Sequence, residues 1–140
     1  MNQEKFDKIV SDAIVGVLKQ GGIAINPSGD CLYRSNDGRK CVVGQIISDE
    51  YYSEKFEGKT IKPLYNEASV VLEAVEKSVG ATLTTDQLSV LIALQNWHDM
   101  WNHDSLLDDM VTRLYHIFDV EELPVIFTRN PDEWLAEAAA

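Results

Sequence analysis

Two cysteines and three histidines carry the side chains best suited to covalent chemistry in this 140-residue chain. Cys41 with His98 and Asp99 is the minimum set for cysteine-based acyl transfer, in which an imidazole raises the thiolate fraction and a carboxylate orients the imidazole. Consecutive residues on a helix point about 100° apart, so we expect Asp99 to lie poorly for orienting His98. Cys41 also stands among apolar residues at strand-like spacing, where a buried cysteine behaves as a small hydrophobe. The sequence favours a structural Cys41 and no catalytic residue, and the trio remains an alternative.

A zinc site is a second possibility, since two cysteines and two histidines are a legitimate ligand set: Cys31, Cys41, His98 and His103. Nine residues separate the cysteines, whereas closed zinc sites usually separate them by about two to four. The two histidines are five residues apart, which turns them away from one another on a helix unless Asn102 ends it. The spacing therefore favours neither a metal nor another cofactor, and a zinc-dependent enzyme remains an alternative.

A local basic patch is the third candidate, and it consists of Tyr33, Arg34, Arg39 and Lys40. Residues 31–41 carry three bases and one acid, a net charge of +2 in an otherwise acidic protein. Arginine and tyrosine often anchor protein interfaces, and hairpin tips often carry binding residues. The alternative is that Tyr33 packs inside the protein and the bases pair with carboxylates of the same molecule.

The acidic residues of the second half are the fourth candidate. The formal net charge is −11, and residues 80–140 contribute −9 of it through eleven acids and two arginines. Such a chain repels a phosphate backbone, so we expect no direct contact with nucleic acid and instead a basic protein partner. Helix polarity favours some of these carboxylates near a helix start and disfavours others at its far end, which suggests a binding role. The binding candidates are Asp108, Asp109, Asp119, Glu121 and Glu122.

The elements that must position these residues are mostly helical. Apolar spacing predicts helices over 3–20, 66–79 and 105–118, a helix that starts at Thr84 and a short one after residue 130. Short helical turns are expected after Gly44, and residues 124–128 suggest a short strand or an extended packing segment. Residues 35–38 have the composition of a tight turn, which predicts a β-hairpin over 31–41. The expected fold is α+β: a single, mostly α-helical domain over residues 1–140 with one hairpin.

Composition also indicates the cellular compartment in which the protein is expected. No apolar run approaches the roughly 18 residues that a membrane helix needs, and residues 1–10 lack a signal-peptide core. With two cysteines and no export signal, the expected location is a reducing cytoplasm with both thiols free and no membrane partner.

The stretch CLYRSNDGRKCVVGQIISDEYY, followed by FEG and later by LQNWHD, resembles a family of small proteins encoded by tailed phages, prophages and some bacteria. The shared frame is Cys-x-Tyr-Arg, a turn with glycine, Cys-x-Val-Gly, and then an isoleucine and a tyrosine. Members often have a further cysteine at the position of Gln45. The resemblance implies a phage or prophage origin and a bacterial cytoplasm, and it implies no mechanism.

The leading hypothesis is an acidic phage accessory protein that binds a host protein and modulates or inhibits it. A host protein that handles nucleic acid or serves in defence would fit the charge. The alternatives are the small Cys/His-dependent or zinc-dependent enzyme described above and a homo-oligomeric structural or regulatory protein.

Overall fold

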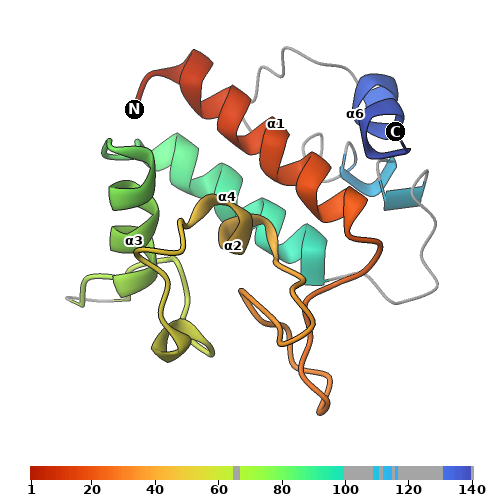
Figure 1. Ribbon diagram of the computed structural model, residues 1–140. Coiled ribbons are helices and arrows are strands. Elements are labelled where there is room, and N and C mark those ends of the chain that lie inside the picture. The colour runs from red at the N-terminus through yellow and green to blue at the C-terminus, as the bar shows by residue number, and fades with distance from the viewer. Residues whose placement is uncertain (65–66, 100–108, 111, 115, 117–130, 140) are drawn as a thin grey trace.

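A computed structural model of the protein describes residues 1–64, 67–99, 109–110, 112–114, 116 and 131–139 (Figure 1). Its elements in chain order are α1 (Gln3–Lys19), α2 (Val42–Ile46), the short 3₁₀ helix η1 (Glu54–Phe56), α3 (Val70–Val79), α4 (Thr85–Asp99) and α6 (Pro131–Ala139). Most of the helix expected over 105–118 and the strand expected over 124–128 lie outside the described residues.

The predicted helix boundaries follow from capping groups. The side chain of Asn2 accepts a hydrogen bond from the Lys5 amide at 3.1 Å and starts α1. A reciprocal pair opens α4: the Thr84 amide donates to Gln87 Oε1 at 2.9 Å, and the Gln87 amide donates to Thr84 Oγ1 at 3.1 Å. The capping box predicted at Thr84 is therefore confirmed.

Helix α3 is shorter than expected. Ser69 caps it by accepting from the Leu72 amide at 3.1 Å, so it begins at Val70 and not at 66. It ends as predicted at Gly80, whose φ of 72° is a left-handed conformation that residues with a side chain seldom adopt.

The expected α+β class is wrong, because no β-strand and no hairpin occur among the residues that the structure describes. Residues 31–41 make only isolated bridges, Ile25 with Cys31 and Arg34 with Lys40. The hairpin fails because its second half does not stay extended: Cys41 is the N-cap of α2, and Val42 already belongs to that helix. We call residues 31–41 the Cys31–Cys41 loop.

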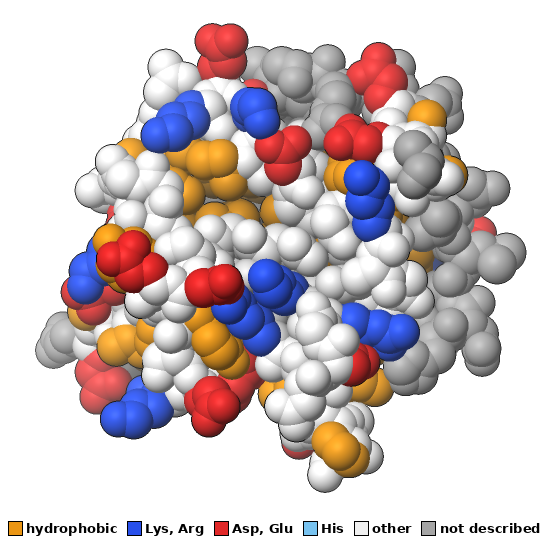
Figure 2. Space-filling model, viewed as in Figure 1, with side chains coloured by type: hydrophobic (Ala, Val, Ile, Leu, Met, Phe, Trp, Pro, Cys, Tyr) orange, Lys and Arg blue, Asp and Glu red, His pale blue; other side chains and the backbone are white. Residues whose placement is uncertain are grey.

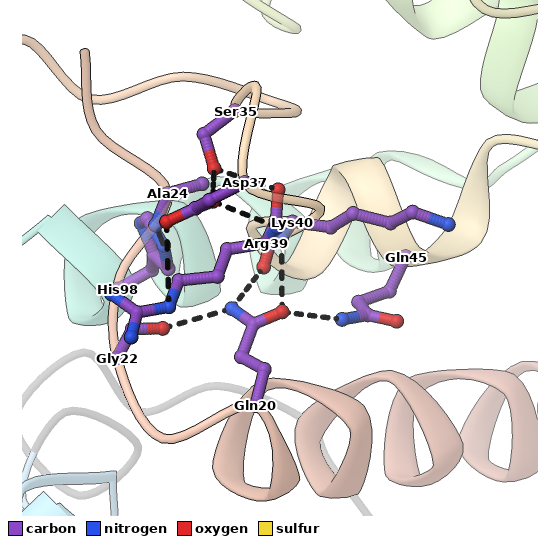
Figure 3. Close-up of polar contacts among 9 residues, drawn as sticks. All are labelled: Gln20, Gly22, Ala24, Ser35, Asp37, Arg39, Lys40, Gln45 and His98. Atoms are coloured by element: carbon purple, nitrogen blue, oxygen red, sulfur yellow. Dashed lines mark hydrogen bonds and ion pairs between the residues drawn. The ribbon is translucent and has the colours of Figure 1, made fainter.

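Side chains from other segments hold the outer edges of this loop. The Tyr33 and Arg34 amides donate to the Glu57 carboxylate at 2.9 and 3.3 Å. On the opposite side, Gln20 accepts from the Lys40 amide at 2.9 Å and donates to the Lys40 carbonyl at 2.6 Å (Figure 3). The two arms are joined by backbone hydrogen bonds from Ser35 to the Arg39 carbonyl at 2.9 Å and from Cys41 to the Tyr33 carbonyl at 3.1 Å, and side chains from elsewhere in the chain bond to their outer edges.

Helix α2 occupies the centre of the described fold. It contacts α1, α3 and α4, and Val42 and Val43 are fully buried. Its Val43 amide donates to Gln95 Oε1 of α4 at 3.2 Å. Helix α6 packs on α1, where the Trp134 indole N–H donates to Ser11 Oγ at 2.7 Å (Figure 1). Among the described residues, no helix is long and apolar enough to cross a membrane.

Gly44 lies where α2 packs closely against the backbone of the Cys31–Cys41 loop, and replacing Gly44 tests how tightly these two segments are packed. A Cβ at Gly44 would overlap the Tyr33 carbonyl oxygen, a backbone atom that cannot move aside. We expect Gly44→Ala to lower the free energy of unfolding by about 2 kcal/mol or more, as overpacking does. Urea unfolding followed by circular dichroism measures this loss.

Gly16→Ala is the matched control, because a Cβ there would lie 2.7 Å from Gln45 Oε1, the end of a flexible side chain. That variant should unfold within about 1 kcal/mol of the wild type, since alanine also favours the helix. Equal effects of the two substitutions would contradict the packing described for α2.

Candidate functional site

The titratable side chains that could do chemistry meet where the Cys31–Cys41 loop reaches the end of α4. Cys31 Sγ, a ring nitrogen of His98 and a carboxylate oxygen of Asp99 all lie within 4.8 Å of one another. His98 is fully buried, whereas Cys31 and Asp99 are exposed. These residue types are those of a catalytic or metal-binding cluster. The protonation and the hydrogen bonds of each side chain decide what chemistry the cluster can do.

His98 has both ring nitrogens engaged. The Ala24 amide donates to Nε2 at 3.2 Å, and Nδ1 lies 2.9 Å from Asp99 Oδ1 (Figure 3 shows the Ala24 contact). An amide N–H can only donate, so Nε2 is the acceptor, and Nδ1 carries the proton and donates to Asp99. The expectation that Asp99 lies poorly for orienting His98 is therefore wrong.

This tautomer removes His98 as a general base. The only basic lone pair of the neutral imidazole is on Nε2, and the Ala24 amide already occupies it. To accept a proton from a thiol, His98 would have to break a buried hydrogen bond and leave the Ala24 N–H without a partner. Such an orphaned donor costs about 1–3 kcal/mol.

Cys31 is held in its protonated form. Partial burial raises its pKa from 9.0 to about 11, and the nearby Asp99 carboxylate, which accepts a hydrogen bond from the thiol, adds to the rise. The charge of Asp30 acts in the same direction. Since the thiolate is the reactive species, Cys31 is a weak nucleophile near neutral pH.

Cys41 is the cysteine of the catalytic alternative, and its surroundings indicate a structural role. It is 1% exposed, and its Sγ accepts from the Gly44 amide at 3.3 Å as the cap of α2. Burial raises its pKa to about 12 despite that hydrogen bond. Among the described residues, the group that gathers around His98 contains Cys31 and not Cys41.

The proposed zinc set is not brought together as expected. His103 lies outside the described residues, and Cys31, His98 and Asp99 are the only three potential ligands that converge within the described part of the chain. A histidine that binds a metal through one nitrogen normally donates its other N–H to an acceptor. Here Nε2 faces the Ala24 N–H, which is a donor, so a metal on Nδ1 would set two donors against each other.

Tyr33 and Arg34 are integrated into the fold and do not form an exposed anchor. Tyr33 is buried, its hydroxyl donates to the Lys59 carbonyl at 2.5 Å, and burial raises its pKa. The Arg34 guanidinium donates to Asp49 Oδ1 at 2.6 Å and to the Ile47 carbonyl at 2.5 Å. It also lies 4.5 Å from the centre of the Tyr52 ring, a cation–π contact.

Arg39 and Lys40 lie on the other edge of the loop. The guanidinium of Arg39 packs over Gly22, and its Nε lies 3.7 Å from Asp37 Oδ2. Lys40 is held by its backbone through Gln20, as Figure 3 shows. On the face drawn in Figure 2, Lys and Arg side chains are interspersed with Asp and Glu side chains and do not gather in one patch.

The acidic binding candidates lie largely outside the described residues: Asp108, Asp119, Glu121 and Glu122. Asp109 is described, and it is helical and exposed. Its helical neighbours Met110 and Leu114 are buried, and the Trp97 indole donates to the Met110 carbonyl at 2.9 Å. Asp109 therefore projects from a segment that is packed against α4.

A cavity of about 350 Å³ adjoins the cluster and was not predicted from the sequence. One wall is the face of α4 that carries Ile92, Gln95, Asn96 and Asp99. The helical spacing of these four residues could have indicated a common face. The opposite walls are residues 31–33 and 58–62, including Lys59 and Lys62, and nothing in the sequence indicates that these two loops meet.

Comparison of the chain with known protein families, curated proteins and solved structures finds no match. The resemblance to a phage family consequently stays a prediction.

Alkylation kinetics test the protonated state of Cys31. At pH 8, its reaction with iodoacetamide should be about ten times slower than that of a thiol in an unstructured peptide. A pKa of about 11 in place of 9.0 lowers the thiolate fraction about 100-fold, and the greater nucleophilicity of the more basic thiolate recovers about tenfold. Peptide mapping by mass spectrometry separates the two cysteines, and the rate should keep rising with pH to about 11.

Asp99→Asn should speed this alkylation several-fold, because it removes a negative charge while keeping an oxygen that accepts from His98. Asp30→Asn should have a smaller effect, since the Asp30 charge is the least of the causes that raise the Cys31 pKa. A rate unchanged by Asp99→Asn would show that the carboxylate does not control the thiol.

Zinc binding tests the histidine tautomer. We expect the purified protein to compete poorly for Zn²⁺ against a chromogenic chelator, with a Kd weaker than about 10 μM, far from the affinity of structural zinc sites. The wild type and Cys31→Ser should behave alike. Stoichiometric zinc that is lost in Cys31→Ser would contradict the assigned hydrogen bond between Ala24 and His98.

Proposed function

We propose that the protein is an acidic accessory protein of phage or prophage origin that works by binding a protein in the cytoplasm of a bacterial host. The observation that carries the proposal is the charge distribution, with −9 of the net −11 in residues 80–140. A host protein that handles nucleic acid or takes part in defence, and that is itself basic, is the partner best suited to this charge. Binding would modulate or inhibit that partner.

The state of the reactive groups supports a binding role over catalysis. Both cysteine pKa values are raised, to about 11 for Cys31 and about 12 for Cys41, so neither thiol is activated. The basic lone pair of His98 is engaged by the Ala24 amide. A thiol enzyme needs a thiolate and a free base, and this cluster supplies neither.

Tyr33 and Arg34 are already bonded within the protein, which favours the acidic half, residues 80–140, as the contact surface. Arg34 pairs with Asp49 and stacks on Tyr52, and these contacts would have to break before it could bind another protein. The exposed carboxylate of Asp109 faces no such cost. Complementary charge accelerates association and selects the partner, and this effect is strongest at low salt.

Charge neutralisation in the acidic half tests this proposal. The variant Asp108→Asn, Asp109→Asn, Glu121→Gln and Glu122→Gln keeps side-chain size and removes four charges. Full-length wild-type protein should capture a host protein from bacterial lysate, and the purified pair should then be measured by calorimetry. We expect the variant to bind up to about tenfold more weakly, from four charge pairs worth a few tenths of a kcal/mol each.

The matched control removes the same number of charges from the other half, at exposed residues Glu50, Glu54, Glu67 and Glu73, each changed to Gln. It should bind like the wild type, and binding of both should weaken as salt rises from about 0.1 to 0.5 M. The proposal fails if the wild type captures no partner, or if the two variants lose affinity equally. Self-association of the wild type as its only interaction would favour the homo-oligomer instead.

A further inference from the structure

The cavity beside α4 has the features of a small-ligand site that is separate from the acidic surface. Its volume of about 350 Å³ falls within the range of ligand pockets. Apolar side chains line much of it: Leu32, Tyr33, Ile61 and Ile92. Tyr33 and Ile61 are buried, so these walls are held by the core. A largely apolar group would find contact with these side chains.

Asp99 gives the cavity a fixed hydrogen-bond acceptor. Its carboxylate receives the His98 Nδ1 proton at 2.9 Å and a hydrogen bond from the Cys31 thiol. These contacts orient the carboxylate, yet its side chain is still 44% exposed. An oriented carboxylate with free lone pairs is suited to accept two parallel N–H bonds from a ligand.

Asn96 lies one helical turn before Asp99 and lines the same wall. It is exposed, and no hydrogen bond joins its amide to any of the described residues. The Asn96 amide can donate a hydrogen bond to a carbonyl oxygen of a ligand whose neighbouring N–H groups donate to Asp99. The pair therefore matches a donor–donor–acceptor edge, which is the Watson–Crick edge of guanine.

Lys59 and Lys62 add positive charge to the opposite wall. Both are exposed, and both also line a second hollow on the other side of residues 58–62. The Tyr33 hydroxyl holds this rim through its 2.5 Å hydrogen bond to the Lys59 carbonyl. Flexible ammonium groups at the edge of an apolar slot suit the phosphate of a ligand whose ring lies inside.

We propose that this cavity binds a guanine mononucleotide, with the base read by Asp99 and Asn96 and the phosphate near Lys59 and Lys62. Recognition of a base by hydrogen bonds to its Watson–Crick edge, between apolar walls, is a general mode of nucleobase binding. The free nucleotide is the expected ligand, since a longer nucleic acid would be repelled by the net charge of −11.

Titration calorimetry of the full chain with GMP tests the proposal, with IMP, AMP, guanosine and inorganic phosphate as comparison ligands. GMP should bind at one site. IMP lacks the 2-amino donor and should bind about tenfold more weakly, and AMP more weakly still, because the oriented Asp99 carboxylate then loses the N–H groups that bond to it. A short single-stranded oligonucleotide ending in guanine distinguishes the free nucleotide from a strand end, and we expect it to bind more weakly than GMP.

Substitutions test which residues contact the base of the ligand and which contact its phosphate. Asp99→Asn should weaken GMP binding about tenfold or more, and Asn96→Ala, at an exposed position, should do so with little risk to folding. Lys59→Gln with Lys62→Gln should weaken GMP binding but leave guanosine binding unchanged. Glu73→Gln, an exposed site on α3, removes the same charge as Asp99→Asn and should have no effect.

Several outcomes would overturn the proposal. These are no saturable binding of GMP up to about 1 mM, equal binding of GMP and AMP, or equal binding of GMP and inorganic phosphate, which would show an anion site only. Unchanged GMP affinity in both Asp99→Asn and Asn96→Ala would place the ligand elsewhere. None of these outcomes bears on the acidic surface proposed to bind a host protein.

Discussion

The buried hydrogen bond from the Ala24 amide to His98 Nε2 joins the chain after α1 to the end of α4. It spans 74 positions of sequence in the fully buried surroundings of His98. By setting the tautomer it directs the Nδ1 proton to Asp99, and Asp99 in turn accepts from Cys31 and raises its pKa. One backbone donor thus sets the tautomer of His98 and its hydrogen bond to Asp99, while burial is the largest cause of the raised Cys31 pKa. Together they turn a cluster that resembles a reactive centre into a structural connection.

A second constraint lies at Cys41, where an expected strand becomes a helix. Cys41 Sγ caps α2, and Gly44 lies so close to the Tyr33 carbonyl that only glycine fits. The Cys41 end of the Cys31–Cys41 loop is thereby fixed to the start of α2. Two backbone hydrogen bonds join the arms of the loop, and the Glu57 and Gln20 side chains satisfy backbone groups on its outer edges.

The sequence was a good guide where local chemistry decides the structure. Caps such as Thr84 with Gln87, and the end of α3 at Gly80, depend on neighbours in the chain, so they could be predicted. The strand expected at Cys41 failed because Val42 and Val43 suit either a strand or a helix, and burial between α1 and α4 decided for the helix. Likewise, the 100° rule for consecutive helical residues did not allow for the 2.9 Å contact between His98 Nδ1 and Asp99 Oδ1.

The candidate site was less predictable, because its parts come from segments that are far apart in the sequence. The sequence shows that cysteine, histidine and aspartate are present. It does not show which cysteine lies beside His98, because the path of the loop brings Cys31 there and not Cys41. The lysines that line the cavity come from residues 58–62, which the Tyr33 hydroxyl and the Glu57 carboxylate hold against the loop. The contacts of Tyr33 with Lys59 and Glu57, which withdraw Tyr33 from the surface, thus help to build the wall of the cavity.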